Sequence, residues 1–208
     1  MEVLRLPGLT SYAAAHELQK RVLEDRIADR VGDTLIVLEH EPTITVGRSR
    51  SALANVLFPG DWPVVEVERG GDVTLHVPGQ IVVYPIAKLV GARQDLHRHL
   101  RALEDAVIDV CDALGLEGRR DARNTGVWLT CSDGAVRKVC SVGIACRRWV
   151  TWHGLALNVD ADLSSFERIR PCGFEAGVMT RLVDHVDVTS ADVVPLLTER
   201  LVSRLSGP

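Results

Sequence analysis

Apolar residues recur at helical spacing in three stretches of this sequence. The first stretch covers 12–30 and has the pattern of an amphipathic helix. The second covers 96–114 and stops at Gly115, a residue type favoured just beyond a helix end. The third covers 190–205, with Pro195 in its early part, where a missing backbone N–H is best tolerated. The pattern therefore predicts helices over these three stretches.

Short runs rich in β-branched residues lie between the predicted helices. They predict strands over 33–40, 43–47, 126–129, 138–146 and 151–159, and on both sides of Gly70-Gly71 within 64–84. Because apolar and polar residues alternate around that glycine pair, this segment predicts a β-hairpin. Strands joined by hairpins, with few helices between them, predict an α+β fold with a mixed or antiparallel sheet packed against helices.

Length and composition indicate an ordinary globular protein. The 208 residues are 46% hydrophobic and 25% charged, which favours a single domain over 1–208. The formal net charge of -4 argues against nucleic acid and anionic membrane as partners. The N-terminus has no long apolar core, and no segment approaches the roughly 20 apolar residues that span a bilayer. We therefore expect a soluble protein that is not exported.

The cysteines do not form a recognisable framework. They stand at 111, 131, 140, 146 and 172, without a CxxC pair or a histidine at zinc-finger spacing. This pattern predicts neither disulfides nor a metal site and fits a reducing cytoplasm. Cys172 differs from the others because Pro171 and Gly173 flank it, a setting that suits a thiol held at a loop tip. Packing as a small apolar residue is the alternative, and it is favoured for the other four cysteines.

Lysine is rare in this chain. Lys20, Lys88 and Lys138 are the three lysines among 24 basic residues. Lys138 opens an otherwise apolar, strand-like segment, where a partly desolvated amine can lose its proton and an arginine cannot. Lys138 is therefore a candidate catalytic residue, with a solvated strand end as the alternative interpretation.

Common catalytic motifs are absent from the sequence. There is no phosphate loop, GxGxxG, HExxH or GxSxG pattern. Polar clusters punctuated by glycine occur instead at 69–76, 137–143, 153–156 and 171–173. Gly70-Gly71 is either a hairpin turn or backbone that closely approaches a ligand. His76 and His153 are either core histidines or residues at the rim of a site.

The clusters, taken in order, identify a family resemblance. The segments "RGGDVTLHVPGQIVVYP" (69–85), "RKVCSVGIACRRWVTWHGLALNV" (137–159) and "IRPCGFEAGV" (169–178) resemble the octanoyl-acyl-carrier-protein:protein octanoyltransferases, also called lipoyl(octanoyl) transferases. The resemblance covers nearly the whole chain. It implies the fold of biotin and lipoate protein ligases.

The resemblance also implies roles for particular residues. Cys172 would carry an octanoyl thioester, and Lys138 would lower the pKa of its thiol. The implied substrate-binding residues are Arg69, Gly70, Gly71, Asp72, Val73, Thr74, Leu75, His76, Ser141, Val142, Gly143, His153, Gly154, Leu155 and Ala156. Val77 replaces a glycine common in the family, which predicts a narrower loop, and 179–182 departs from the usual Thr-Ser-Leu ending.

The implied donor is octanoyl-acyl carrier protein. The implied acceptors are the lipoyl domains of 2-oxoacid dehydrogenase complexes and the glycine cleavage H protein, with no cofactor and no metal. Because both protein substrates are expected to be acidic, arginines are candidate docking charges; these are Arg119, Arg120, Arg147, Arg148, Arg168 and Arg170. Solvated surface positions are the alternative for each of them.

The alternative functions are distinguishable by experiment. An ATP-dependent lipoate or biotin protein ligase on the same fold would require ATP and no nucleophilic cysteine. An amidotransferase between protein lysines would use the cysteine but a different donor. A non-catalytic module that binds acyl carrier protein or lipoyl domains would retain binding after replacement of Cys172.

Overall fold

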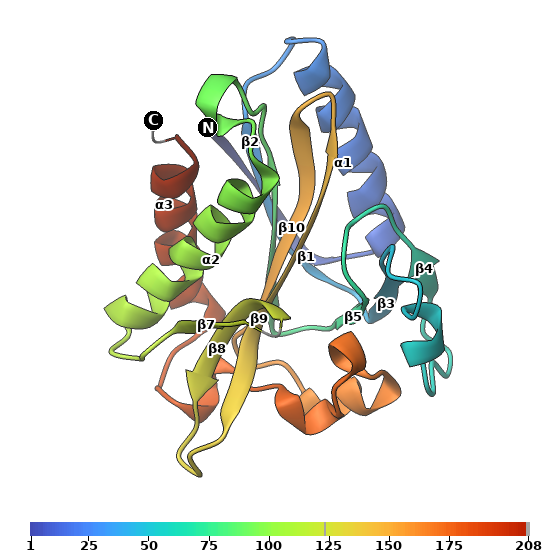
Figure 1. Cartoon of the computed structure of the whole chain (residues 1–208), viewed down its shortest axis with the longest axis vertical. Helices are drawn as coiled ribbons and strands as arrows, with labels where there is room; N and C mark the ends of the chain where they lie inside the picture. The colour runs from blue at the N-terminus through green and yellow to red at the C-terminus, as the bar shows by residue number, and fades with distance from the viewer. Residues whose placement is uncertain (123, 207–208) are drawn as a thin grey trace.

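The computed structural model describes residues 1–122 and 124–206, and the side chains of 172 and 176 lie outside this description. Within these residues a large sheet has the strand order β1-β2-β6-β10-β9-β8-β7 (Figure 1). Its strands are β1 (Glu2–Thr10), β2 (Thr34–His40), β6 (Gln80–Ile86), β7 (Arg119–Asp121), β8 (Asn124–Thr130), β9 (Val136–Arg147) and β10 (Val150–Asn158). Only the β1–β2 pair is parallel among these described strands, so the predicted mixed sheet is confirmed.

A second, smaller sheet lies beside the large one and has the order β4-β3-β5. Its strands are β3 (Thr43–Val46), β4 (Val64–Glu66) and β5 (Val73–His76). The three longer helices are α1 (Tyr12–Ile27), α2 (Leu96–Ala113) and α3 (Ser190–Ser206). Short 3-10 turns complete the described structure: η1 (Leu53–Asn55), η2 (Gly91–Arg93), η3 (Leu163–Arg168), η4 (Pro171–Gly173), η5 (Ala176–Val178) and η6 (Leu182–Asp184).

The large sheet is covered on both faces (Figure 1). Leu35 and Val37 of β2 pack into an apolar core with α2 and α3. Their neighbours Ile36 and Leu38 point to the opposite face and pack with α1. Successive strand residues alternate between faces, so burial of both faces explains why the central strands are continuous apolar runs. The α2 and α3 helices lie together on one face, and α1 covers the other.

The predicted helices are confirmed, with small shifts at their ends. Asp95 caps α2, because its carboxylate accepts a hydrogen bond from the Arg98 N–H at 3.0 Å. Gly115 follows the helix with a φ of +74°, the left-handed conformation that glycine adopts without penalty. Helix α1 ends at Ile27 rather than at residue 30.

The predicted hairpin across Gly70-Gly71 is wrong. Strand β3 lies between β4 and β5 and pairs with each of them, so the strands on the two sides of the glycine pair do not contact as a hairpin. The residues after the glycine pair, predicted as one strand, form two strands, β5 and β6, that belong to different sheets. Pro78-Gly79 separates them, and the φ of +85° at Gly79 turns the chain between sheets.

Two strands at the edges of the large sheet were not predicted from the sequence. Strand β1 is mostly exposed, and its pairing with β2 is interrupted between Arg5 and Leu9, around Pro7-Gly8. Strand β7 consists of Arg119, Arg120 and Asp121. Both strands lack the regular apolar alternation that identifies a strand half buried against a core.

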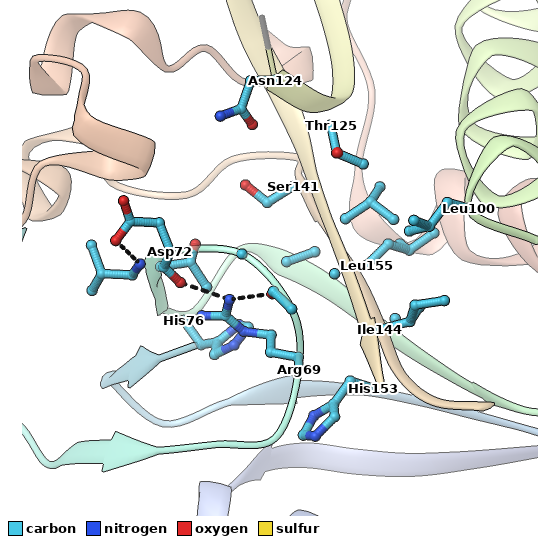
Figure 2. Close-up of a pocket in the computed structure, with 18 of the residues that line it drawn as sticks. Arg69, Asp72, His76, Leu100, Asn124, Thr125, Ser141, Ile144, His153 and Leu155 are labelled. Atoms are coloured by element: carbon cyan, nitrogen blue, oxygen red, sulfur yellow. Dashed lines mark hydrogen bonds between the residues drawn. The ribbon is translucent and has the colours of Figure 1, made fainter. Parts of the chain in front are cut away.

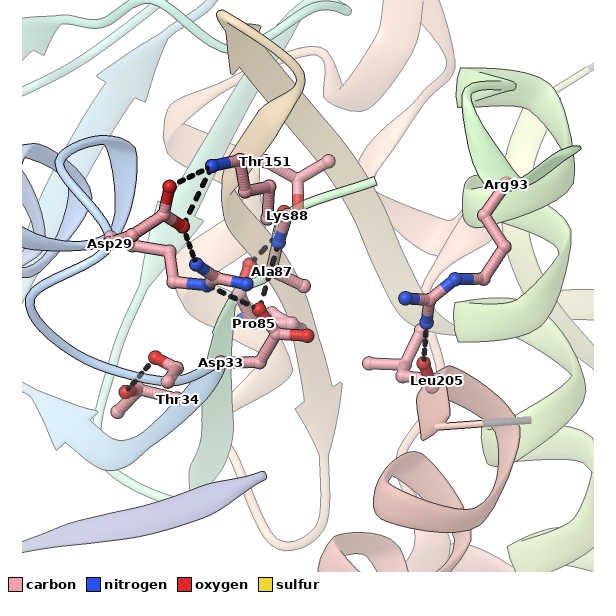
Figure 3. Close-up of polar contacts among 11 residues, drawn as sticks. Asp29, Asp33, Thr34, Pro85, Ala87, Lys88, Arg93, Thr151 and Leu205 are labelled. Carbon is pink, nitrogen blue, oxygen red and sulfur yellow. Dashed lines mark hydrogen bonds and ion pairs between the residues drawn. The ribbon is translucent and has the colours of Figure 1, made fainter. Parts of the chain in front are cut away.

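A polar cluster joins the end of α1 to the strands beneath it (Figure 3). The Arg26 Nε donates to Asp33 Oδ1 at 2.7 Å, and the same carboxylate oxygen accepts from the Lys88 backbone N–H at 2.9 Å. The Lys88 Nζ donates to both oxygens of Asp29, at 2.7 and 2.5 Å. These contacts fix the turn between α1 and β2 against the end of β6.

Among the described helices, none is long and apolar enough to cross a membrane.

Candidate active site

A cavity of about 400 Å³ is lined by both sheets (Figure 2). All of the substrate-binding residues implied by sequence line it except Leu75, and Lys138 lines it as well. Leu75 is fully buried and packs in the apolar core of the small sheet. Val77 packs in that same core and is not a lining residue, so it does not narrow the cavity directly. The remaining lining residues are Tyr12, Ser49, Tyr84, Leu100, Asn124, Thr125 and Ile144.

The cavity has walls of different character (Figure 2). Leu100 of α2, Ile144 of β9 and Leu155 of β10 lie together on one side and present apolar surface. Arg69 and His76 lie on the opposite side. A mostly apolar pocket with a few convergent polar groups is typical of a site for a small acyl group or cofactor.

Glycines allow the loop at 69–72 to lie directly on the large sheet. Gly143 of β9 faces Gly154 of β10 across the strand pair. A Cβ atom on Gly143 would stand 3.1 Å from the Gly70 carbonyl oxygen. The Gly70 N–H donates to the Ile144 carbonyl at 2.9 Å, so the loop is bonded to β9 at this point. Of the two interpretations of the glycine pair, the hairpin turn is wrong, and the pair forms part of the cavity wall.

Arg69 holds this loop in shape. Its guanidinium donates to the carbonyl oxygens of Asp72 at 2.7 Å and Thr45 at 2.8 Å. The Asp72 carboxylate accepts from the Val73 N–H at 2.7 Å and from Asn55 Nδ2 at 2.8 Å. The Arg69 guanidinium and the Asp72 carboxylate are thus both hydrogen-bonded to other residues of the chain. These bonds fix the shape of the cavity wall.

Lys138 is buried at the cavity surface, with 4% of its area exposed. Its Nζ donates to Asn124 Oδ1 at 2.7 Å and lies 5.6 Å from the centre of the Trp128 ring. Gly126 makes room for this side chain, since a Cβ at that position would be 2.5 Å from Lys138 Cε. The lysine is therefore desolvated and oriented, and the solvated strand end considered as an alternative is excluded.

The segment that carries Cys172 packs next to the same cavity. Turn η4 (Pro171–Gly173) contacts β5, whose Val73 and Thr74 are lining residues. Seven residues beyond Gly173, the Thr180 N–H donates to the Lys138 carbonyl at 2.9 Å. The Cys172 side chain itself lies outside the described part of the structure. Its role stays a prediction.

Histidine and tyrosine side chains form a buried wall beside the cavity. His40 Nδ1–H donates to the Thr10 carbonyl at 2.9 Å, so its Nε2 accepts from the Tyr84 hydroxyl at 2.7 Å. Burial lowers the pKa of His40 to about 4 and that of His153 to about 3, and it raises the pKa of Tyr84 well above its ordinary value. Burial also lowers the pKa of His76 well below its ordinary value. At neutral pH this wall is therefore uncharged.

These buried histidines predict a loss of stability in mild acid. Burial lowers the pKa of His99 to about 4, as it does for His40. In the unfolded chain a histidine takes up a proton below about pH 6.5. The unfolded state therefore binds more protons than the folded state between pH 6.5 and 4, and stability falls as pH falls through this window, by up to about 1.4 kcal/mol per pH unit for each histidine. We expect the free energy of unfolding in urea to be at least about 2 kcal/mol lower at pH 5.5 than at pH 7.5. Equal values at the two pH values would contradict this prediction.

Several lining residues were not identified from sequence. Tyr12 comes from the first turn of α1 and gave no signal in the sequence; Leu100 comes from α2, where helical periodicity assigns it only to an apolar face. Asn124, which binds Lys138, lies in no glycine-punctuated cluster.

Three of the candidate docking arginines have partners within the chain: Arg120 binds Glu104 and Asp105, Arg147 pairs with Glu24, and Arg168 donates to the Phe58 carbonyl.

The fold matches solved structures of protein ligases. The lipoate protein ligase of Thermoplasma acidophilum, whose structural analysis included its E2 lipoyl domain, matches with a TM-score of 0.70 at 17% identity, covering 99% of this chain and 84% of that one. The biotin protein ligase of Aquifex aeolicus matches with a TM-score of 0.54 at 13% identity, covering 99% and 69%. The predicted fold of biotin and lipoate protein ligases is confirmed.

Sequence similarity is more specific than the fold. Residues 11–202 match the lipoyl protein ligase A/B catalytic domain. The octanoyltransferase of Gloeobacter violaceus is 44% identical over 191 residues, which are 90% of this chain and 84% of that protein. The chain belongs to the lipoyl protein ligase A/B catalytic domain family and, within it, groups with the octanoyltransferases. It is an acyltransferase of protein lipoylation, as the three sequence segments predicted.

Proposed function

We propose that this chain moves an octanoyl group from octanoyl-acyl carrier protein to a lysine of lipoyl domains through a thioester on Cys172. The observation that carries this proposal is the buried Lys138, which lines the cavity while its backbone carbonyl binds the segment that follows Cys172. A lysine ammonium close to a thiol favours the thiolate and is a common means of activating a cysteine nucleophile.

In the first half-reaction, Lys138 favours the thiolate of Cys172. The thiolate attacks the carbonyl carbon of the octanoyl thioester, a tetrahedral oxyanion forms, and the carrier thiolate leaves and takes up a proton. One thioester replaces another, so the exchange is nearly balanced in energy and needs no ATP. Backbone N–H groups near Cys172 and Gly143 are the candidate donors to the oxyanion.

In the second half-reaction, the ε-amine of the acceptor lysine attacks the acyl-enzyme. An amide bond forms, the C–S bond breaks, and Cys172 leaves as a thiolate. The amine loses a proton during this step, and neutral Lys138 is the proposed base that accepts it. Lys138 is neutral at this stage because in the first half-reaction its ammonium gave a proton to the leaving carrier thiolate, which became a thiol.

The cavity supports an acyl substrate with no charge in its tail. Leu100, Ile144 and Leu155 supply apolar contact, and the histidine wall is neutral at physiological pH. Lipoyl domains are the proposed acceptors, both in 2-oxoacid dehydrogenase complexes and in the glycine cleavage H protein. A free thiol as nucleophile requires a reducing compartment, so we place the reaction in the cytoplasm.

An intact mass spectrum tests the proposal. The protein is mixed with octanoyl-acyl carrier protein in the absence of ATP, alongside Cys172→Ala and Cys131→Ala, whose cysteine is partly exposed. We expect the wild type and Cys131→Ala to gain one octanoyl group that hydroxylamine removes, and Cys172→Ala to gain none. An adduct that persists in Cys172→Ala would move the nucleophile elsewhere.

The same experiment separates the alternatives. Modification of the acceptor that depends on ATP and free octanoate, with no acyl-enzyme, would indicate a ligase on this fold. Carrier binding without an adduct or turnover would indicate a non-catalytic module. Acylation by an octanoylated protein lysine, and not by the carrier, would indicate an amidotransferase.

A further inference from the structure

Three side chains distant in sequence converge at the histidine wall, and one of them, His153, belongs to it. His16 comes from α1, Glu68 from the chain just after β4, and His153 from β10. The Glu68 Oε2 atom lies 3.0 Å from His16 Nε2 and 3.6 Å from His153 Nε2. All three ligand atoms lie within 4.8 Å of one another. Two imidazole nitrogens thus point at one carboxylate oxygen.

The cluster contains a buried polar atom without a hydrogen-bond partner in the described residues. This atom is Nε2 of His153, whose side chain is 2% exposed. Leaving such an atom unpaired is unfavourable, and a bound ligand would satisfy it. His16 and Glu68 are more accessible, at 13% and 35%, which leaves a route to solvent.

His153 also has an unusual backbone. Its φ is +56° in the interior of β10, although it is neither glycine nor in a turn. The Gln19 Oε1 atom accepts from its backbone N–H at 3.0 Å and supports this conformation. Non-glycine residues held in the left-handed region are strained, and such residues are concentrated at functional sites. The strained backbone directs the ring of His153 toward Glu68.

The separations suit a tetrahedral metal ion. Zinc bonds to nitrogen and oxygen are about 2.0–2.2 Å long, which places tetrahedral ligand atoms roughly 3.3 Å apart. The observed 3.0 and 3.6 Å lie on either side of this value. Two histidines with one glutamate are also a common zinc donor set.

We propose that His16, Glu68 and His153 bind a divalent transition-metal ion of the zinc type, with water in the fourth position. Neutral imidazoles and an ionised carboxylate are the forms of these side chains that bind metal.

The ion would act on the shape of the cavity. Glu68 immediately precedes Arg69 and the loop whose glycines form a cavity wall. A bound metal would tie this loop to α1 and β10 at the same time, and it would fix the orientation of the His153 ring. Short metal-binding sequence motifs do not predict this site, because its three ligands are separated by 52 and 85 residues along the chain.

Metal titration tests the proposal. Untagged protein is treated with chelator, and the binding of Zn²⁺ and Co²⁺ is measured at pH 7.5 by calorimetry and by visible absorption. We expect one ion per chain, a tetrahedral Co²⁺ spectrum without a sulfur charge-transfer band, and a higher thermal midpoint with Zn²⁺. In Glu68→Gln and His16→Ala we expect affinity to fall at least 10-fold and the thermal shift to disappear.

His97→Ala is the matched control, because His97 is an exposed histidine outside the cluster. It should bind metal as the wild type does, and circular dichroism should show that all variants are folded. No stoichiometric binding would overturn the proposal. So would a thiolate band in the Co²⁺ spectrum, which would place the ion on a cysteine, or an affinity unchanged in Glu68→Gln.

Discussion

Replacing Lys138 with methionine is expected to reduce octanoyl transfer by a factor of about 10²–10⁴, the usual contribution of a positioned acid or base. Methionine retains much of the length and apolar contact of lysine, so the packing against Trp128 and Gly126 should survive. The variant loses the amine that donates to Asn124. Both half-reactions should slow, since the proposed role of this amine includes activation of the thiol and removal of the acceptor proton.

The two half-reactions are measured separately by rapid quench and mass spectrometry, first from octanoyl-acyl carrier protein to enzyme and then from acyl-enzyme to a lipoyl domain. Lys138→Arg should not restore the rate, because a guanidinium does not give up its proton. Lys20→Met is the control, since Lys20 is a partly exposed lysine on α1 that pairs with Glu17, away from the cavity. Wild-type rates in Lys138→Met would remove this lysine from the mechanism.

Replacing Glu104 with leucine is expected to lower the free energy of unfolding by about 3 kcal/mol. Glu104 is a fully buried carboxylate on α2. It accepts from Arg101 Nη1 at 2.7 Å, from Arg120 Nε at 2.8 Å and from the Gly126 N–H at 2.8 Å. The arginines can turn toward water, but the Gly126 N–H is buried and would lose its partner. Activity should fall too, because Gly126 packs against the Lys138 side chain.

Urea unfolding with an unchanged m value measures this effect. Asp109→Leu is the control on the same helix, because Asp109 pairs with Arg204 at 2.7 Å near the surface and should contribute less than about 1 kcal/mol. A Glu104→Leu variant as stable as Asp109→Leu would show that the buried carboxylate is dispensable.

Much of the fold could be predicted from short-range patterns. Helix α2 was predicted from its apolar stripe and from Gly115 just beyond its end, and the structure contains both features. The pattern failed where pairing is decided by distant contacts. Strand β3 separates β4 from β5, and no local feature of 64–76 indicates that a strand from 43–46 inserts between them. Exposed edge strands such as β1 were also missed. They have no buried face, so their sequences lack the alternation of apolar and polar residues that predicts a strand.

The site was predictable to a similar extent. The scarcity of lysine identified Lys138 as a candidate, and the family resemblance implied most of the other residues around the cavity. Asn124, which orients that lysine, and Tyr12 gave no local signal, because each depends on a contact made only in the folded chain. Hydrogen-bond partners and burial are properties of the three-dimensional arrangement, and spacing along the chain does not encode them directly.

The origin of the cavity walls limits how substrate range can be engineered. A Cβ on Gly154 would stand 2.2 Å from the Val83 carbonyl oxygen, so the central sheet cannot be remodelled at that position without moving its backbone. Leu100 is different: among the described lining residues it is the only one carried by α2. A library aimed at longer or branched acyl groups should therefore begin at Leu100, where a smaller side chain enlarges the pocket and leaves the sheet intact.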